Sequence, residues 1–265
     1  MTLRVEVVTY DFGNTLVRVD RASARVVAGA TATALLRLGM IDDTAAYLGV
    51  WAEERDRQFR EEVPNLREVD LAQRVIRVLA RLRGTRPPAA DERWDDAAAA
   101  EHVEPAEVDA AIGAYSSAFV ETMRPEPEAG PHLERTHARG FRLGVLSNWP
   151  LAATIDRFVE AQGWAPLFAA IVVSQRVGAI KPHPAIFRAA AEQLAVVPER
   201  VLHVGDDWAA DVVGASRARW HAAYLRDRQS DTPLPTSAPG AEVRPDLVID
   251  DLVELEARIE PWSPE

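Results

Sequence analysis

Four short apolar runs, each followed by polar residues, are the most regular feature of the hydrophobic pattern. They occupy residues 3–10, 141–146, 169–173 and 201–204. Their β-branched and aliphatic content is typical of strands that are buried on both faces of a parallel sheet. A helical pattern follows each run, as expected of repeated βαβ units. The pattern therefore predicts an α/β protein with a doubly wound parallel sheet.

The stretch between the first two predicted strands is too long for a single crossover and has helical periodicity. Apolar residues recur at helical spacing and predict helices over residues 22–39, 43–62, 71–82 and 108–123. We therefore expect a helical domain that is inserted into the α/β domain.

The expected domain bounds follow from this insert. Residues 1–18 and 126–265 form the α/β core domain, and residues 19–125 form the helical domain. Within the insert, Pro87, Pro88 and the residues up to about 100 are predicted to form a loop. Arg74, Arg77 and Arg81 form a stripe opposite the apolar face of one helix. Such a stripe is usually the solvated face, and the alternative is contact with an anionic substrate.

The end of the chain has fewer clear signals. Residues 228–245 are rich in Pro, Ser and Thr and are predicted to form an exposed loop. A late strand over residues 246–249 and a short terminal helix are expected after it.

Composition excludes some classes of function. The net charge of −11 argues against nucleic acid as a partner, because there is no basic excess to neutralise phosphates. The chain has no apolar run of membrane-spanning length and opens without a leader pattern, so we expect a cytoplasmic protein with no membrane partner. The absence of cysteine excludes disulfides and thiol chemistry. A monomer or a homodimer is expected.

Polar residues at the ends of the predicted strands are the candidates for chemistry. They are Asp11, Ser147, Lys181, Asp206 and Asp211. Right-handed crossovers would place all of them at one edge of the sheet, where open α/β sheets bind ligands. Carboxylates buried there require a cation or several hydrogen-bond donors.

Four motifs contain these residues. They are Asp11–Thr15, Ser147-Asn148, Lys181-Pro182 and Gly205–Asp211, the last with Gly214-Ala215 behind it. In their order and spacing they resemble the motifs of the haloacid-dehalogenase-like (HAD) hydrolases of the phosphatase type. The resemblance covers residues 3 to about 225, and the helical insert resembles the C1-type cap domain of that family.

The resemblance implies a mechanism and a metal ion. Asp11 would be the nucleophile and form an aspartyl-phosphate that water hydrolyses. Mg²⁺, a hard cation that prefers oxygen ligands, would bind Asp11, the carbonyl of Gly13 and Asp206. Asp211 or Asp207 would complete the metal site, directly or through water.

Further residues would contact the substrate. Ser147 and the backbone amide of Asn148 would donate hydrogen bonds to the phosphoryl oxygens, and Lys181 would neutralise the remaining charge. Thr15 is also expected at the substrate. Trp149 follows a strand end, where it would either line the substrate pocket or serve in packing.

Gly13 is a departure from the family pattern. HAD phosphatases usually have a second aspartate two residues after the nucleophile, which protonates the leaving oxygen. General acid–base help of this kind is typically worth about 10²–10⁴-fold in rate. Three interpretations follow: the leaving group needs no proton, another residue such as Asp207 supplies it, or the protein is a non-catalytic binding module.

A metal-independent 2-haloacid dehalogenase is the main alternative enzyme, since halide leaves without a proton. The acidic Gly205-Asp206-Asp207 favours a cation, and hence phosphate. The sequence thus predicts a Mg²⁺-dependent phosphohydrolase that acts on a small phosphorylated metabolite. Among the remaining residues, His203 is predicted to be a satisfied core residue and Asn14 to hold the turn after Asp11.

Overall fold

A computed structural model describes residues 2–228, 231–241 and 243–263. The chain forms two compact units. The sheet unit contains the described residues of Met1–Arg21 and Met123–Glu265, and the helical unit contains Ala22–Thr122. Among the described residues, no helix has both the length and the apolar character that a membrane crossing requires.

A six-stranded parallel sheet forms the centre of the sheet unit, with the strand order β6-β5-β2-β7-β8-β9. Its strands are β2 (Val7–Tyr10), β5 (Arg142–Ser147), β6 (Phe168–Val173), β7 (Val201–Gly205), β8 (His221–Leu225) and β9 (Leu247–Ile249). The sheet extends in both directions from the central strand β2, which confirms the predicted doubly wound α/β class.

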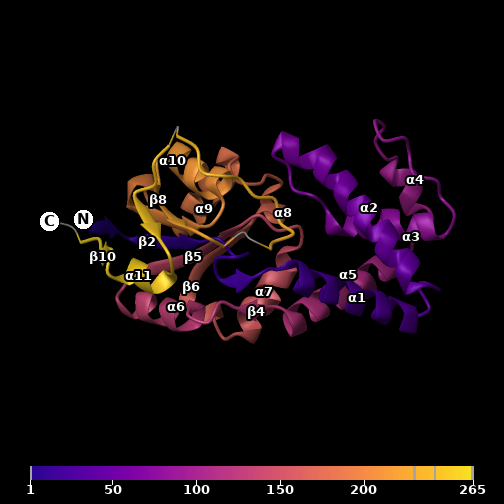
Figure 1. Cartoon of the computed structure of the whole chain (residues 1–265), viewed down its shortest axis with the longest axis horizontal. Helices are drawn as coiled ribbons and strands as arrows, with labels where there is room; N and C mark the ends of the chain where they lie inside the picture. Colours follow the sequence, from indigo (N-terminus) through magenta and orange to yellow (C-terminus); the bar gives the residue numbers. More distant parts are fainter. Residues whose placement is uncertain (1, 229–230, 242, 264–265) are drawn as a thin grey trace. The chain divides into compact units, whose positions relative to one another are not determined.

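Helices cover both faces of this sheet. They are α6 (Ala129–Ala138), α7 (Ala152–Ala161), α8 (Ser174–Val177), α9 (Pro184–Leu194), a π-helical stretch (Trp208–Val213), α10 (Gly214–Arg217) and α11 (Leu252–Glu256). Figure 1 shows α9 and α10 on one side of the sheet and α6 and α11 on the other. Ile186 and Phe187 of α9 are fully buried against sheet residues such as Val172 and Val201. This packing fixes the strand ends that form the site.

The first predicted strand is divided in two. β1 (Leu3–Val5) pairs with β10 (Ile259–Pro261), whereas β2 starts at Val7 and belongs to the main sheet. Glu6 separates them, and its amide donates to the carbonyl of Arg200 at 2.8 Å. The hydrophobic pattern does not reveal this division, because both halves are apolar and only the pairing partner changes.

The chain leaves the sheet unit and returns to it at two neighbouring strands. Where the chain leaves the sheet unit, β3 (Val17–Arg18) pairs antiparallel with β4 (Arg124–Pro125), where the chain returns. The helical unit is thus inserted between two paired strands.

The helical unit is built from five α-helices and a short 3-10 helix, η1 (Val63–Asn65), within its described residues. The α-helices are α1 (Arg21–Arg37), α2 (Thr44–Glu62), α3 (Leu71–Leu82), α4 (Asp96–Ala100) and α5 (Pro105–Thr122). Asp43 and Asp70 cap α2 and α3 by accepting hydrogen bonds from backbone amides of the first turn. The short helix α4 lies where the sequence predicts a loop. Asp95 explains its start, because its carboxylate accepts from the amide of Ala98 at 3.0 Å.

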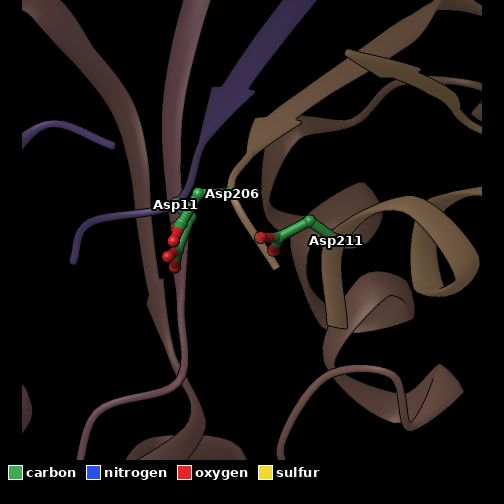
Figure 2. A group of neighbouring side chains, drawn as sticks. All are labelled: Asp11, Asp206 and Asp211. Atoms are coloured by element: carbon green, nitrogen blue, oxygen red, sulfur yellow. The ribbon is translucent and has the colours of Figure 1, made fainter. Parts of the chain in front are cut away.

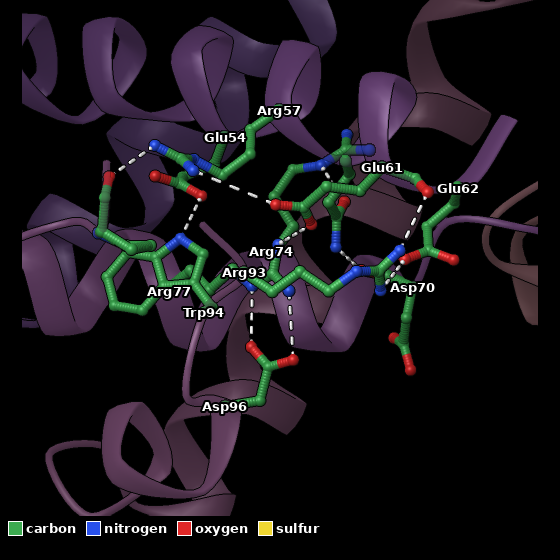
Figure 3. Close-up of polar contacts among 12 residues, drawn as sticks. Glu54, Arg57, Glu61, Glu62, Asp70, Arg74, Arg77, Arg93, Trp94 and Asp96 are labelled. Atoms are coloured by element: carbon green, nitrogen blue, oxygen red, sulfur yellow. Dashed lines mark hydrogen bonds and ion pairs between the residues drawn. The ribbon is translucent and has the colours of Figure 1, made fainter. Parts of the chain in front are cut away.

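The arginine stripe of α3 is not a solvated face, so this prediction is wrong. Arg74 and Arg77 are each only 5% exposed. Figure 3 shows the polar network that surrounds them. Arg77 pairs with Asp96 of α4 and Glu61 of α2, and Arg81 pairs with the buried Glu54. Acidic side chains from neighbouring helices therefore provide the counter-charges of Arg77 and Arg81, whereas Arg74 donates to the neutral side chain of Gln58.

Candidate active site

Three carboxylates meet at the carboxyl edge of the sheet. Asp11 follows β2 directly, and its amide donates to the carbonyl of Val204 in β7 at 2.8 Å. Asp206 follows β7, and Asp211 lies in the π-helical stretch behind it. Figure 2 shows these three side chains converging. One oxygen of each lies within 4.8 Å of the others, close enough for a single metal ion.

Lys181 lies between two of these carboxylates. Its Nζ donates to Asp11 Oδ1 at 2.8 Å and to Asp211 Oδ1 at 2.6 Å. The side chain is 1% exposed, so water cannot replace either partner. The two carboxylates raise the pKa of Lys181 against the opposing effect of burial, and Lys181 remains an ammonium ion.

Asp211 is held by neighbours on both oxygens. His203 Nε2 lies 2.9 Å from Oδ1, which also accepts from Lys181, and Oδ2 accepts from the amide of Asp207 at 2.9 Å. Burial alone would raise the pKa of Asp211, but Lys181 and His203 hold it well below its ordinary range. Asp211 therefore stays ionised. Gly205 is required beside it, because a Cβ at this position would overlap the Asp211 carboxylate.

His203 links this carboxylate to the sheet. Its Nδ1 lies 3.0 Å from Thr9 Oγ1 in β2, and burial lowers its pKa, so that the ring is neutral. Because a carboxylate only accepts hydrogen bonds, Nε2 carries the proton toward Asp211, and Nδ1 accepts from the Thr9 hydroxyl. The prediction that His203 is a satisfied core residue is confirmed.

Asp11 is the most accessible of the three carboxylates. Its side chain is 14% exposed, whereas that of Asp211 is 2% exposed. Burial raises the pKa of Asp11 to about 6, while Lys181 opposes this shift and the negative charge of Asp211 adds to it. An aspartate that is accessible and close to a fixed ammonium ion is suited to nucleophilic attack.

Asn148 positions Lys181 through its side chain. Its Oδ1 accepts from the Lys181 amide at 2.6 Å, and its Nδ2 donates to the Lys181 carbonyl at 3.1 Å. The sequence interpretation assigned only the backbone amide of Asn148 to a role. Ser147, at the end of β5, is 1% exposed, and its Oγ has no hydrogen-bond partner among the described residues. A buried hydroxyl without a partner is able to hydrogen-bond a polar group of a ligand or an ordered water.

Thr15 and Trp149 lie close to this group. Thr15 is fully buried, and its Oγ1 lies 3.4 Å from Asp206 Oδ1, which is a long contact for a hydroxyl. Trp149 is 4% exposed, and its ring meets that of Phe12 edge-on at a centroid distance of 6.1 Å. The indole thus takes part in core packing.

The turn after Asp11 is held by Asn14, as predicted. Asn14 has a φ of 57°, which asparagine tolerates better than most residues. Its Oδ1 accepts from the amide of Val19 at 3.2 Å, and its Nδ2 donates to Thr232 Oγ1 at 3.1 Å. The second bond shows that residues 228–245 are not simply an exposed loop. Thr232 is 5% exposed, so that prediction is wrong at this residue, whereas the other described residues of the segment form a loop and are exposed or partly exposed.

Asp207 is used as a helix cap. Its Oδ1 accepts from the amide of Ala210 at 2.7 Å and from Ser237 Oγ at 2.8 Å, and its Oδ2 accepts from the Ser237 amide at 2.7 Å. Burial raises its pKa, and these donors oppose the shift. The cluster of carboxylates near Asp11 contains Asp211 and not Asp207.

Sequence reasoning missed several contacts of the site. The Thr9 hydroxyl contacts His203 of the adjacent strand, and His203 in turn contacts Asp211. The alternation of side chains along β7 is a signal that could have shown which face of the sheet His203 lies on. No local signal marks Thr232 or Ser237, because both act on residues about 30 or more positions away in the chain.

The similarity of this chain to known proteins agrees with this arrangement. Residues 5–219 match the family model for haloacid dehalogenase-like hydrolases. The chain therefore belongs to the haloacid dehalogenase-like hydrolase family.

Two curated relatives are phosphatases by name. A glyceraldehyde 3-phosphate phosphatase of Methanopyrus kandleri is 32% identical over 46% of this chain and 52% of its own length. A phosphoserine phosphatase of Thermus thermophilus is 35% identical over 49% of each chain. The chain thus spans about half the length of these curated relatives.

Solved structures share the fold over nearly the whole chain. A 2-haloacid dehalogenase of Pseudomonas syringae superposes with a TM-score of 0.63 at 22% identity and covers 96% of this chain and 99% of its own. A putative HAD-hydrolase of Bacillus subtilis, bound to magnesium, superposes with a TM-score of 0.58 at 18% identity over 96% and 98%. At sequence identities this low, the similarity shows a shared fold and carries no conclusion about activity.

Proposed function

We propose that the protein is a Mg²⁺-dependent phosphohydrolase that acts on a small phosphorylated metabolite through an aspartyl-phosphate on Asp11. The observation that carries the proposal is the charge of the site. Three clustered carboxylates, Asp11, Asp206 and Asp211, share the site with the ammonium ion of Lys181, which pairs with Asp11 and Asp211, while His203 is neutral. The carboxylates outnumber this ammonium ion in a largely buried site, which favours a divalent cation.

The donor set fits magnesium. Carboxylate and carbonyl oxygens are the ligands that this hard cation prefers, and it retains several waters. Asp11 and Asp206 would bind it, together with the carbonyl of Gly13. Both oxygens of Asp211 already accept hydrogen bonds, so Asp211 would act through water and through Lys181. The cation would supply charge neutralisation for a phosphate dianion beside the carboxylates.

The residues of the chain would divide the remaining work. Asp11 attacks phosphorus, the bond from phosphorus to the leaving oxygen breaks, and the leaving group takes the electron pair. Lys181 and the Ser147 hydroxyl hold the phosphoryl oxygens, which requires the unpartnered Oγ of Ser147 to donate. Water then attacks phosphorus and regenerates the Asp11 carboxylate together with inorganic phosphate.

The phosphatase names of the two curated relatives support phosphate over halide as the group removed. The position of the helical unit, inserted between β3 and β4, supports its assignment as a C1-type cap. The shared 2-haloacid dehalogenase fold keeps dehalogenation as the second candidate.

A substrate screen with a nucleophile variant tests the proposal. Phosphate esters, acyl phosphates and 2-haloacids are assayed with Mg²⁺ and with EDTA, using the wild type and Asp11→Asn. We expect phosphate release only with Mg²⁺, and Asp11→Asn to lower it by roughly 10³-fold or more. Mg²⁺ binding by calorimetry provides a readout that is independent of turnover.

The other outcomes decide between the alternatives. Halide release in EDTA would identify a dehalogenase. A wild type that is inert toward every substrate and binds no Mg²⁺ would indicate a binding module. Full activity of Asp11→Asn would contradict the covalent mechanism.

A further inference from the structure

A C-terminal segment, residues 231–237, is tied to both loops that carry the candidate catalytic aspartates. At one end Thr232 accepts from Asn14 of the first loop at 3.1 Å. At the other end Ser237 donates twice to Asp207, and its Oγ accepts from the amide of Ala209 at 2.6 Å. Leu234 lies between these attachments, and its amide donates to Thr232 Oγ1 at 3.2 Å.

Leu234 fills the space beside Gly13. A Cβ at position 13 would lie 2.8 Å from Leu234 Cδ1, 3.7 Å from Val19 Cγ2 and 4.0 Å from Trp149 Cζ3. The backbone of Gly13 is outside the left-handed region and would accept another residue. Space, and not backbone conformation, therefore limits this position, because a Cβ here requires the end of the Leu234 side chain to move. The three neighbours around this space are apolar.

Nearby carboxyl groups do not compensate for the missing side chain. Asp207 uses both oxygens to accept hydrogen bonds from Ala210 and Ser237. Asp211 uses both to accept from Lys181, His203 and the Asp207 amide. Neither group is placed to give a proton to a leaving oxygen on the Gly13 side.

We propose that Leu234, by filling the space beside Gly13, keeps a proton donor out of it, and that the enzyme is thereby restricted to phosphates whose leaving group departs as an anion. The proposal rests on the phosphohydrolase function proposed above. With Val19 and Trp149, Leu234 forms an apolar wall where a proton donor at position 13 would lie. When Asp11 attacks, the leaving oxygen keeps the electron pair and departs unprotonated. This selects acyl phosphates and aryl phosphates, whose products are a carboxylate and a phenolate, over alkyl phosphates.

The wild-type test is a leaving-group series. The kcat/KM is measured for aryl phosphates of rising phenol pKa, for acetyl phosphate and for β-glycerol phosphate. We expect a steep fall with leaving-group pKa and a value for the alkyl ester on the order of 10²-fold or more below that for p-nitrophenyl phosphate, because no acid protonates the alkoxide.

Leu234 offers a matched pair of variants, because Asp and Asn have the same shape and, like Leu, branch at Cγ into two heavy atoms. Leu234→Asp places an acid in the wall, whereas Leu234→Asn changes polarity without supplying one. We expect Leu234→Asp to raise the ratio of alkyl to acyl phosphate turnover by about 10²-fold, and Leu234→Asn and Leu234→Ala to leave this ratio within a few-fold of wild type. Gly13→Asp combined with Leu234→Ala should shift the ratio in the same direction as Leu234→Asp.

The outcomes separate the two proposals. A wild type inert on all phosphates would refute the phosphohydrolase. Equal turnover of alkyl and aryl phosphates would leave the phosphohydrolase standing and refute the role of Leu234. The same refutation follows if Leu234→Asp and the Gly13→Asp/Leu234→Ala double variant both fold, by circular dichroism, yet leave the ratio unchanged.

Discussion

The ammonium group of Lys181 lies 2.6 Å from Asp211 Oδ1, and both side chains are almost completely buried. This pair is part of a chain of contacts in which Thr9 and His203 support Asp211 from the sheet. Asp211, which the sequence places among the metal ligands, thus has an observed role in holding the lysine that contacts Asp11.

Asp211→Asn tests this positioning role. An amide cannot balance the lysine charge and presents a donor to neighbours that need an acceptor, so Lys181 should shift away from Asp11. We expect kcat on the best phosphate substrate to fall by on the order of 10²-fold, the loss that a misplacement of about 1 Å can cause. Asp207→Asn is the matched control in the same loop, and it should cost stability with a smaller effect on kcat, because the amide keeps the cap but cannot also accept from the Ser237 amide. Equal losses of kcat in both variants would contradict the role.

Ser147→Ala should separate function from stability. The Ser147 hydroxyl is buried without a partner among the described residues, so its removal takes away an unsatisfied polar group. We expect the free energy of unfolding to stay constant or to rise by up to about 1 kcal/mol. Phosphatase kcat/KM should fall by about 10²-fold if the hydroxyl binds a phosphoryl oxygen. Urea unfolding and initial rates measure the two effects, and a stability loss with unchanged kcat/KM would assign Ser147 to the fold instead.

Because of the buried His132, we expect the free energy of unfolding to decrease as the pH falls. It is fully buried between Tyr10 Oη and Glu256 Oε1, at 2.9 Å from each, and burial lowers its pKa despite the carboxylate. The unfolded chain therefore takes up the proton first. The stability that depends on neutral His132 is fully present above the pKa of histidine in the unfolded chain, about 6.5. It is lost as the pH falls through this value, by at most about 1.4 kcal/mol per pH unit for one proton.

The measurement is urea unfolding between pH 5 and pH 8. His132→Gln should flatten the pH dependence, because the residue no longer titrates. His137→Gln, an exposed position on the same helix α6, is the control and should keep the wild-type slope. Identical slopes in wild type and His132→Gln would show that His132 does not contribute, and His203 would then be tested.

Arg74 and Arg77 should respond in opposite ways to replacement by methionine. The guanidinium of Arg74 donates to the neutral Gln58 and lies 5.2 Å from the centre of the Trp51 ring, while its Nη2 has no hydrogen-bond partner among the described residues. Burial lowers its pKa to about 10. Removing this poorly compensated charge should be neutral or stabilising by about 1 kcal/mol, since methionine fills a similar volume.

Arg77→Met instead removes the arginine partner of Asp96 and one of the two arginine partners of Glu61. We expect a loss of about 2 kcal/mol, below the ~3–5 kcal/mol of a fully buried pair because Asp96 is partly exposed. Urea unfolding of the two variants gives the comparison. A larger loss for Arg74→Met than for Arg77→Met would contradict this account of the network.

The sequence predicted the class of fold and the gathering of Asp11, Lys181, Asp206 and Asp211 because both depend on local patterns. Buried parallel strands have continuous apolar runs, and right-handed crossovers bring their polar ends to one edge. The order of strands and the division at Glu6 could not be predicted, since pairing depends on residues far away in the chain.

The remaining errors have the same origin. The arginine stripe has the appearance of a solvated face because its acidic partners are on other helices. The segment around Leu234 is rich in Pro, Ser and Thr, as exposed loops are, and only its distant contacts with Asn14, Gly13 and Asp207 show that it belongs to the site. Local composition does not report such contacts.

The antiparallel pair β3–β4 has a consequence for how this chain can change. Val17 and Pro125 are paired neighbours. The residues between them therefore form one long loop whose two ends are held together by this pair. The entropy of closing a loop grows only logarithmically with its length, by about 0.6 kcal/mol for each doubling. The segment inserted between β3 and β4 can therefore be lengthened, shortened or replaced with little loss in the free energy of folding of the sheet unit. This tolerance applies both to natural sequence change and to engineered replacement of the helical unit.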